Sequence, residues 1–312
     1  MRRVEIHQFG GPDVLQVGEA EVPTAGPGEV VLEMLASGIN PVDYKMRQGH
    51  SIWLEDFSDF PFFPGREGVG RVSALGPEVT DFAVGDLVFG HPGMEPKQGC
   101  HAEFAVFPVE RLAPAPEGVD PIILGGTPMA ALTAWTAVHD YANVQAGERV
   151  LIHGAGGGVG QWIVQWCVLA GATVFGSAST RHHDRITELG ARHLDYTAGD
   201  VFEAMGGPAD VIIDGVYFNT FEPSLDHLTD GGRIIAIPSL ADLTPARERG
   251  IEAHIAIMES NPEVLARVGR DLAEGRVSTQ IARVFGMDDL AEAHRILETG
   301  HAPGKLVLDL RR

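Results

Sequence analysis

The strongest chemical signal in the sequence is a run of small residues, His153-Gly-Ala-Gly-Gly-Gly-Val-Gly160, between an apolar strand-like stretch and an apolar helix-like stretch. Small residues at such a junction let the backbone approach a pyrophosphate, and the helix N-terminus supplies free N–H donors. The spacing predicts a dinucleotide-binding turn with Ala155 at the first fingerprint glycine. The turn residues are Ala155, Gly156, Gly157, Gly158, Val159 and Gly160. The alternative is a turn that only packs the helix against the strand.

The segment after the next predicted strand carries hydroxyls and an arginine instead of an acid. It reads Gly176-Ser-Ala-Ser-Thr-Arg-His-His183, and no acidic residue precedes Asp184. An NAD site usually has Asp or Glu about 20 residues after the turn, to bind the ribose 2′-hydroxyl. Hydroxyls and the Arg181 guanidinium suit the 2′-phosphate of NADP instead. The alternative is that Ser179 or Thr180 only caps the helix while Arg181 is solvated. We expect His182 and His183 at the surface.

A parallel sheet must position these residues. Strands are predicted over 149–153, 172–175, 210–214 and 233–237, with helices over 159–170, 181–189 and 221–228. Apolar strands that alternate with helices are typical of a parallel sheet covered on both faces. The second half of the chain is therefore predicted to be a doubly wound α/β domain.

The first 110 or so residues read differently, as short strands separated by Gly and Pro turns. Strands are predicted over 30–35, 69–73 and 102–106, and this density indicates an irregular β-barrel. Two helices, 262–274 and 288–299, and a last strand, 305–310, end the chain. We predict a first domain over 1–120, completed by about 260–312, and a second domain over 121–259.

Composition excludes several classes of function. The chain has 23 basic and 43 acidic residues, a net charge of −20, which disfavours nucleic-acid and anionic-membrane binding. Its two cysteines cannot form a disulfide framework or a four-thiolate zinc site. The N-terminal residues lack a signal-peptide core, and the charge-free stretches 121–138 and 150–180 contain proline or many glycines. We expect a cytoplasmic protein without a membrane span.

Further segments carry a family resemblance. They are Asn40-Pro-Val-Asp-Tyr-Lys-Met-Arg-Gln-Gly49, Phe63-Pro-Gly-Arg-Glu-Gly-Val-Gly70, Leu132-Thr-Ala-Trp135 and Gly304-Lys-Leu-Val-Leu308. With the glycine-rich turn, they make the chain resemble the medium-chain dehydrogenase/reductase family almost end to end, specifically its zinc-free quinone oxidoreductase branch with the zeta-crystallin-like proteins. The resemblance implies a GroES-like catalytic domain, an inserted Rossmann domain and a cofactor cleft between them.

The resemblance also implies where zinc would bind in the alcohol dehydrogenase branch. Asn40 and Arg66 stand where that branch has a Cys and the His that precedes the acid at Glu67. An amide and a guanidinium cannot replace a thiolate and an imidazole as zinc ligands. We predict that no metal is bound. Asp43 is expected to be structural and paired with Arg66.

Site residues follow from the same resemblance. It implies that Thr133 lies beside the nicotinamide, Ser239 at the carboxamide and Asn40 at the nicotinamide ribose and the substrate. The residues implied around the 2′-phosphate are Ser177, Ser179, Arg181 and Tyr196.

Without a metal, the negative charge that develops on an acceptor oxygen needs a donor. Tyr44 and Lys45 are the nearest candidates, and Lys45 is one of only three lysines in the chain. The alternative for Lys45 is a surface role. The aromatic residues between Trp53 and Phe63 either line a site for a planar ring or pack the core.

The sequence thus predicts an NADPH-dependent oxidoreductase that reduces a quinone or another conjugated carbonyl. The alternatives are an enone or enoyl-thioester reductase, or an NADPH-binding protein without turnover. Polar and apolar residues alternate over 250–257, so this segment is predicted to pair across a two-fold axis in a homodimer.

Overall fold

The computed structural model describes residues 1–54, 57–300 and 302–312. These residues form two compact units. Unit 1 comprises Met1–Met129 and Ser260–Arg312, and unit 2 comprises Ala130–Glu259. Whereas the sequence predicted a boundary at 120, unit 1 continues to Met129. The continuation includes helix α2 (Pro121–Gly125), which packs against strand β3 (Glu29–Ile39) so closely that a Cβ on Gly125 would lie 2.7 Å from the Ala36 Cβ.

Unit 1 is built on an irregular, mostly antiparallel sheet in the strand order β14-β15-β3-β4-β5-β7, with β6 also paired to β3. The other strands are β4 (Gly68–Leu75), β5 (Leu87–Gly90), β6 (Phe104–Pro108), β7 (Leu112–Pro114), β14 (Ile281–Phe285) and β15 (Lys305–Asp309). A separate pair is β1 (Arg2–Ile6) with β2 (Leu15–Glu19), and the helices besides α2 are α1 (Pro41–Arg47), α9 (Pro262–Ala273) and α10 (Leu290–Glu298). The last strand, β15, pairs with β3, so the end of the chain returns to the first domain's sheet.

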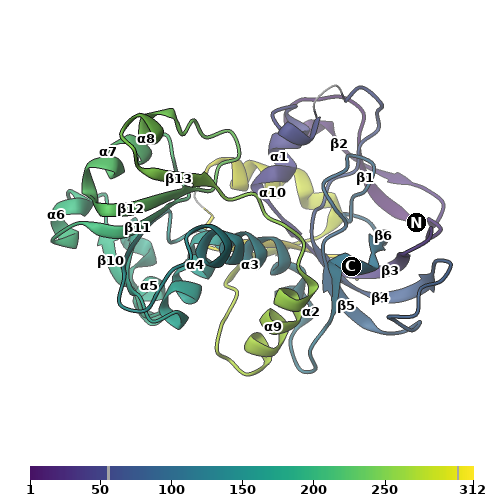
Figure 1. The fold of residues 1–312 in the computed structure, drawn as a ribbon. Coiled ribbons are helices and arrows are strands. Elements are labelled where there is room, and N and C mark those ends of the chain that lie inside the picture. The colour runs from purple at the N-terminus through teal and green to yellow at the C-terminus, as the bar shows by residue number, and fades with distance from the viewer. Residues whose placement is uncertain (55–56, 301) are drawn as a thin grey trace. The chain divides into compact units, whose positions relative to one another are not determined.

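Unit 2 is a six-stranded parallel sheet in the order β10-β9-β8-β11-β12-β13. The strands are β8 (Arg149–His153), β9 (Thr173–Ala178), β10 (Arg192–Asp195), β11 (Ala209–Asp214), β12 (Leu228–Ala236) and β13 (Glu252–Ile255). The helices are α3 (Pro128–Trp135), which is followed by a π-helix over Thr136–Tyr141, and α4 (Gly158–Leu169), α5 (His183–Glu188), α6 (Val201–Met205), α7 (Phe221–Ser224) and α8 (Thr244–Glu248). In Figure 1, α4 and α5 lie on one side of this sheet and α7 and α8 on the other. This is the predicted doubly wound arrangement.

Burial on both faces explains the strand sequences of unit 2. Val150, Leu151 and Ile152 on β8 are all fully buried, as are Val211 and Ile212 on β11. A strand covered on both faces needs apolar side chains at every position, which produces continuous apolar runs without alternation. The sheet core therefore places the carboxyl ends of β8, β9 and β10 side by side, where the polar turns begin.

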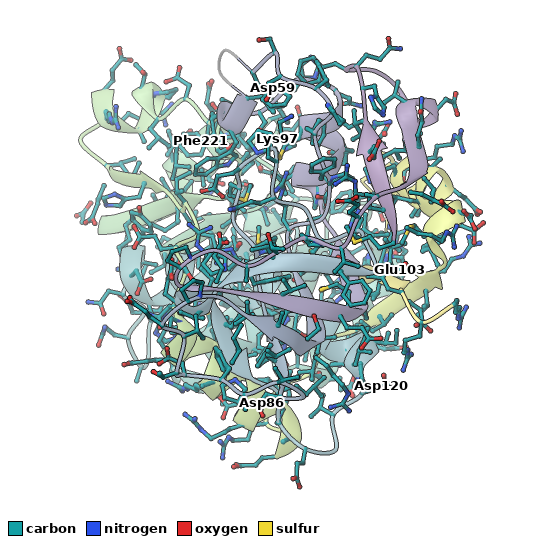
Figure 2. All side chains as sticks on the ribbon, turned by 90° about the vertical axis from the view of Figure 1, so that its right-hand side faces the viewer. Asp59, Asp86, Lys97, Glu103, Asp120 and Phe221 are labelled. Carbon is teal, nitrogen blue, oxygen red and sulfur yellow. The ribbon has the colours of Figure 1, made fainter. Side chains whose placement is uncertain are left out.

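Acidic side chains hold loops of unit 1. Asp86 accepts a hydrogen bond from the backbone N–H of Ala83 at 2.8 Å, and Asp120 caps α2 by accepting from Ile122 N–H at 2.9 Å (both carboxylates are labelled in Figure 2). Part of the chain's negative charge thus satisfies backbone donors. In the described part of the chain, no helix is long and apolar enough to cross a membrane.

Candidate functional site

The glycine-rich turn joins β8 to α4. Gly154 has φ +75°, so the left-handed backbone conformation falls one residue before Ala155. A Cβ on Gly160 would lie 2.1 Å from the carbonyl oxygen of Gly154. Any side chain at position 160 would therefore force the helix away from the turn, which is why a glycine stands there.

Ala155 is fully buried and links the turn to β9. Its N–H donates to the Ser177 carbonyl oxygen at 3.1 Å, and a Cβ on Gly176 would come within 2.9 Å of the Ala155 methyl group. Glycine on the neighbouring strand thus leaves room for the alanine in the turn.

The first helical residues of α4 are Gly158, Val159 and Gly160, and their N–H groups have no acceptor within the helix. Because α4 has twelve residues, its N-terminus also carries a partial positive charge. The turn therefore fits a pyrophosphate, because its small residues and free donors allow one to bind close to the backbone.

His182 was expected at the surface, and this expectation is wrong. The side chain is buried, and a Cβ on Gly156 would lie only 2.5 Å from the imidazole Cγ. Arg181 Nε donates to His182 Nε2 at 3.1 Å. Burial lowers the pKa of His182, and the charges of Arg181 and His193 lower it further. A neutral imidazole therefore forms one wall of the turn.

Donor groups gather after the carboxyl ends of β9 and β10. Ser177 is buried on β9, Ser179 is half-buried, and Arg181 and Tyr196 are exposed. The terminal guanidinium nitrogens of Arg181 and the Tyr196 hydroxyl make no hydrogen bond to the described residues, nor does the Ser179 hydroxyl. These groups are available to a ligand.

An acid that the sequence did not reveal lies beside them. Asp195 ends β10 directly opposite Ala178 of β9, and it accepts a hydrogen bond from the Thr180 hydroxyl. Thr197 donates to its other oxygen from the backbone N–H at 2.8 Å and from the hydroxyl at 2.7 Å. The bonds from Thr180 and Thr197 lower the pKa of Asp195 to about 2. The Asp195 carboxylate therefore stays ionised at the strand ends where the donors of Ser179, Arg181 and Tyr196 lie.

Two further predicted cofactor residues belong to unit 2. Thr133 is half-buried on α3, and Ser239 is exposed in the turn that follows β12. Ser239 lies at the same carboxyl edge of the sheet as the glycine-rich turn, with β11 between β12 and β8.

In unit 1, Asn40 belongs to a buried polar cluster with Glu67 and Lys305. Asn40 Nδ2 donates to Glu67 Oε1 at 2.8 Å, and Lys305 Nζ donates to Glu67 Oε1 at 2.6 Å and to Asn40 Oδ1 at 2.5 Å. The second carboxylate oxygen of Glu67 accepts from Met129 N–H at 2.7 Å. Glu67 is fully buried, so these bonds satisfy a carboxylate that water does not reach.

The residues at the implied zinc position do not fit a zinc ion. Arg66 is buried and donates to the carbonyl oxygens of Glu95 at 2.9 Å and Phe63 at 3.1 Å, and also to that of Gln98. The Lys305 ammonium already occupies the side of Glu67 that faces Asn40. In the part of the chain that the structure describes, no three His, Cys, Asp or Glu side chains are grouped to hold a metal. An amide, a guanidinium and one ion-paired carboxylate are not a zinc donor set.

Asp43 has the expected structural role, and its charge acts on the Arg66 guanidinium, but the two side chains form no direct ion pair. The Asp43 carboxylate accepts from the backbone N–H of Asn40 at 2.8 Å and of Gly65 at 3.0 Å. It therefore fixes the start of α1 and the loop before β4, while Arg66 binds backbone carbonyls instead.

Tyr44 and Lys45 are both half-buried on α1. Burial, helped by Glu298, raises the pKa of Tyr44, whereas burial lowers the pKa of Lys45. The Lys45 ammonium has no hydrogen bond or ion pair with the described residues. Burial thus makes the Lys45 ammonium a better proton donor than an exposed lysine, and it makes the Tyr44 hydroxyl a weaker acid than an exposed tyrosine.

The aromatic segment mostly packs the core. Phe57 contacts Phe60 and Phe62 with ring centroids 5.4 and 6.3 Å apart, in a cluster that includes Ile6. Trp53 is 43% exposed and takes no part in this cluster, and positions 55 and 56 lie outside the described residues. Packing therefore accounts for these phenylalanines.

Comparison with known proteins identifies the family of this chain. The alcohol dehydrogenase GroES-like domain family matches residues 26–117, and the zinc-binding dehydrogenase family matches residues 189–308. A 2-haloacrylate reductase from Burkholderia sp is 30% identical over 97% of this chain and 97% of its own length. A quinone oxidoreductase from Pseudomonas aeruginosa is 27% identical over 98% of this chain and 99% of its own.

Among solved structures, the quinone oxidoreductase from Coxiella burnetii matches with a TM-score of 0.94 at 30% identity, over 99% of both chains. These matches confirm the predicted fold, a GroES-like domain and a Rossmann-type parallel sheet. The chain belongs to the medium-chain dehydrogenase/reductase family of nicotinamide-dependent oxidoreductases, in its quinone oxidoreductase branch.

Proposed function

We propose that this protein reduces a quinone or another conjugated carbonyl with NADPH and without a metal ion. The observation that carries the proposal is the phosphate-binding turn whose neighbouring strand, β9, is followed by free donors. A guanidinium with two unoccupied terminal nitrogens suits a phosphate dianion better than a ribose hydroxyl, which supports NADPH over NADH.

Each predicted residue receives a binding role in this proposal. The turn from Ala155 to Gly160 binds the pyrophosphate, and Ser239 and Thr133 bind the nicotinamide end. The 2′-phosphate is held by Ser177, Ser179, Arg181 and Tyr196. When bound, the reduced nicotinamide supplies a hydride to the acceptor.

The acceptor oxygen must be stabilised by this chain's own donors. Asn40 binds the nicotinamide ribose and the substrate through its amide N–H. Lys45 donates a proton to the oxygen that gains negative charge, since its lowered pKa favours proton release. Tyr44, whose pKa is raised, stays protonated and acts as a neutral hydrogen-bond donor. No step needs a Lewis acid, because hydride transfer to a conjugated system depends mainly on positioning.

The quinone class is supported by the relatives named quinone oxidoreductase. A second class, conjugated acids and enones, is supported by the relative named 2-haloacrylate reductase, because an acrylate conjugates a carbon–carbon double bond with a carboxylate. Quinones, enones and acrylates all accept a hydride at carbon or oxygen, and the negative charge that results moves onto an oxygen of the acceptor. Binding of NADPH without turnover is the third outcome.

A panel assay distinguishes the three. Oxidation of NADPH is followed by its near-ultraviolet absorbance with quinones, simple enones, 2-chloroacrylate and crotonyl-CoA, in separate reactions. Turnover of quinones supports the proposal, and turnover of only enones, acrylates or thioesters supports the second class. Tight NADPH binding with no turnover of any acceptor would contradict a reductase function.

We also propose a homodimer formed through β13. Within the described chain this strand pairs only with β12, so its outer edge carries unpaired N–H and C=O groups. Such an edge favours the addition of a strand from a second copy. Light scattering at micromolar concentration should give twice the chain mass of 33.4 kDa, and a monomeric mass would contradict the proposal.

A further inference from the structure

Lys305, the first residue of β15, is a buried lysine in a chain with only three lysines. Its side chain is 6% exposed. The ammonium contacts two side chains, Asn40 and Glu67, at 2.5 and 2.6 Å. Water would solvate the ammonium of a surface lysine, whereas the buried ammonium of Lys305 depends on these two side chains. The contact with Asn40 in turn constrains the Asn40 amide.

The contacts fix the orientation of the Asn40 amide from both sides. An ammonium only donates hydrogen bonds, so the amide must turn its oxygen toward Lys305. A carboxylate only accepts, so the amide must turn its nitrogen toward Glu67. The reverse orientation would face donor to donor and acceptor to acceptor.

The rest of the cluster is equally constrained. Glu67 is anchored to the backbone through Met129 N–H at 2.7 Å, and a Cβ on Gly38 would come within 2.0 Å of the Glu67 carboxylate. The backbone N–H of Asn40 is held by Asp43 at 2.8 Å. One polar hydrogen of Asn40 then makes no bond to the described residues: the second N–H of its amide.

We propose that Lys305 is a positioning residue, which acts through Asn40 to present that amide N–H to the nicotinamide half of the cofactor. The inference rests on the proposed function, in which Asn40 binds the nicotinamide ribose. Lys305 itself does not touch the cofactor in this proposal. Its role is to exclude the amide orientation that would present an oxygen instead.

The test must separate positioning from folding. Lys305→Met alone leaves a buried carboxylate without a counter-charge, which can unfold the protein. The double variant Lys305→Met/Glu67→Gln removes both charges and keeps a hydrogen-bonding side chain at position 67. Lys305→Arg keeps the positive charge and the donors. The matched control is Lys97→Met, because Lys97 is 42% exposed and pairs with Asp59 at 3.2 Å (both are labelled in Figure 2).

Two ligands are compared by equilibrium binding: NADP⁺, and 2′-phospho-ADP, which lacks both the nicotinamide ring and the nicotinamide ribose. Loss of one well-placed hydrogen bond should weaken NADP⁺ binding by about tenfold in the Lys305→Met/Glu67→Gln variant. The affinity of the same variant for the fragment should change by less than about twofold. The Lys305→Arg variant should retain most of the wild-type affinity for NADP⁺. The Lys97→Met control should bind both ligands with wild-type affinity.

A mutant cycle with Asn40 completes the test. Asn40→Ala should weaken NADP⁺ binding as much as the double variant does. The triple variant should bind NADP⁺ no more weakly than Asn40→Ala alone, because Lys305 acts through the Asn40 amide. Additive losses, or equal losses for NADP⁺ and the fragment, would overturn the inference. An Asn40→Ala variant that binds NADP⁺ as well as the wild type would instead show that Asn40 is misplaced in the proposed function. Failure of the wild type to bind either ligand would refute the proposed function and the inference together.

Discussion

Replacement of Arg181 by alanine should change cofactor preference rather than catalysis. Among the residues that the structure describes, Arg181 makes one hydrogen bond, from its Nε to His182, which leaves both terminal nitrogens available to a phosphate. A guanidinium that donates two parallel bonds to a phosphate contributes about 1.5–3 kcal/mol, or roughly 10- to 100-fold in affinity. The removal of Arg181 should therefore weaken NADPH binding and leave NADH binding nearly unchanged.

Two features of the structure place the effect at the lower end of that range. Arg181 is exposed, so solvent and salt screen its charge. Asp195, whose pKa is lowered to about 2, keeps a negative charge beside the same strand ends and opposes the dianion. We expect kcat/KM for NADPH to fall by about tenfold in Arg181→Ala, and kcat/KM for NADH to stay within about twofold. Asp195→Asn should move the preference the other way, by a few-fold toward NADPH.

The assay measures kcat/KM for both cofactors with the best acceptor from the panel, at low and at physiological ionic strength. Arg192→Ala is the matched control, because Arg192 lies at the amino end of β10 and its loss changes the net charge equally. An equal loss with NADPH and NADH, or an equal effect of Arg192→Ala, would refute the reasoning. So would a wild type that uses NADH as well as NADPH.

Three other outcomes are expected. Gly156→Ala should destabilise the fold by about 1–3 kcal/mol because the new methyl group meets the His182 ring, and His182→Ala in the same chain should recover most of the loss in urea unfolding. Prolonged chelation should leave activity intact and elemental analysis should find well under one zinc per chain; stoichiometric zinc with activity lost on chelation would contradict the argument from Asn40 and Arg66. Stability should fall on acidification below pH 6.5, since burial lowers the pKa of His91 to about 4 and of His294 to about 3, so that only the unfolded chain takes up these protons. Each histidine should cost about 1.4 kcal/mol near pH 5.5, and a His294→Leu variant should show a flatter dependence of unfolding free energy on pH, which an unchanged slope would contradict.

Local patterns made the sheet and the turn predictable. The strand, the small residues and the helix that form the turn are adjacent in the chain, and burial on both faces left continuous apolar runs for β8 and β11. The short strands β10 and β14 carry no such run, because Arg192, His193 and Arg283 interrupt them. Their pairing partners, not their composition, make them strands.

The site residues that the sequence missed depend on neighbours from distant segments. His182 lies among polar residues, and only the missing side chain at Gly156 opens the space that buries its ring. Asp195 comes from the strand beside β9, so a search for an acid along β9 itself does not find it. Lys305 contacts a side chain 265 positions away. The scarcity of lysine and the family-like segment Gly304-Lys-Leu-Val-Leu308 marked it in the sequence, but neither indicated its contact with Asn40.

Stability alone does not explain the buried pair of Glu67 and Lys305. Removing two charges from water costs several kcal/mol per ion, and well-packed apolar residues of similar volume are often equally stable in such places. Here the pair is kept with a full set of bonds, in which Glu67 accepts from Lys305, Asn40 and the backbone N–H of Met129. An apolar pair would fill the same volume but would leave the Asn40 amide free to take either orientation. The charged pair holds that amide in a single orientation, which is what the proposed binding role of Asn40 requires.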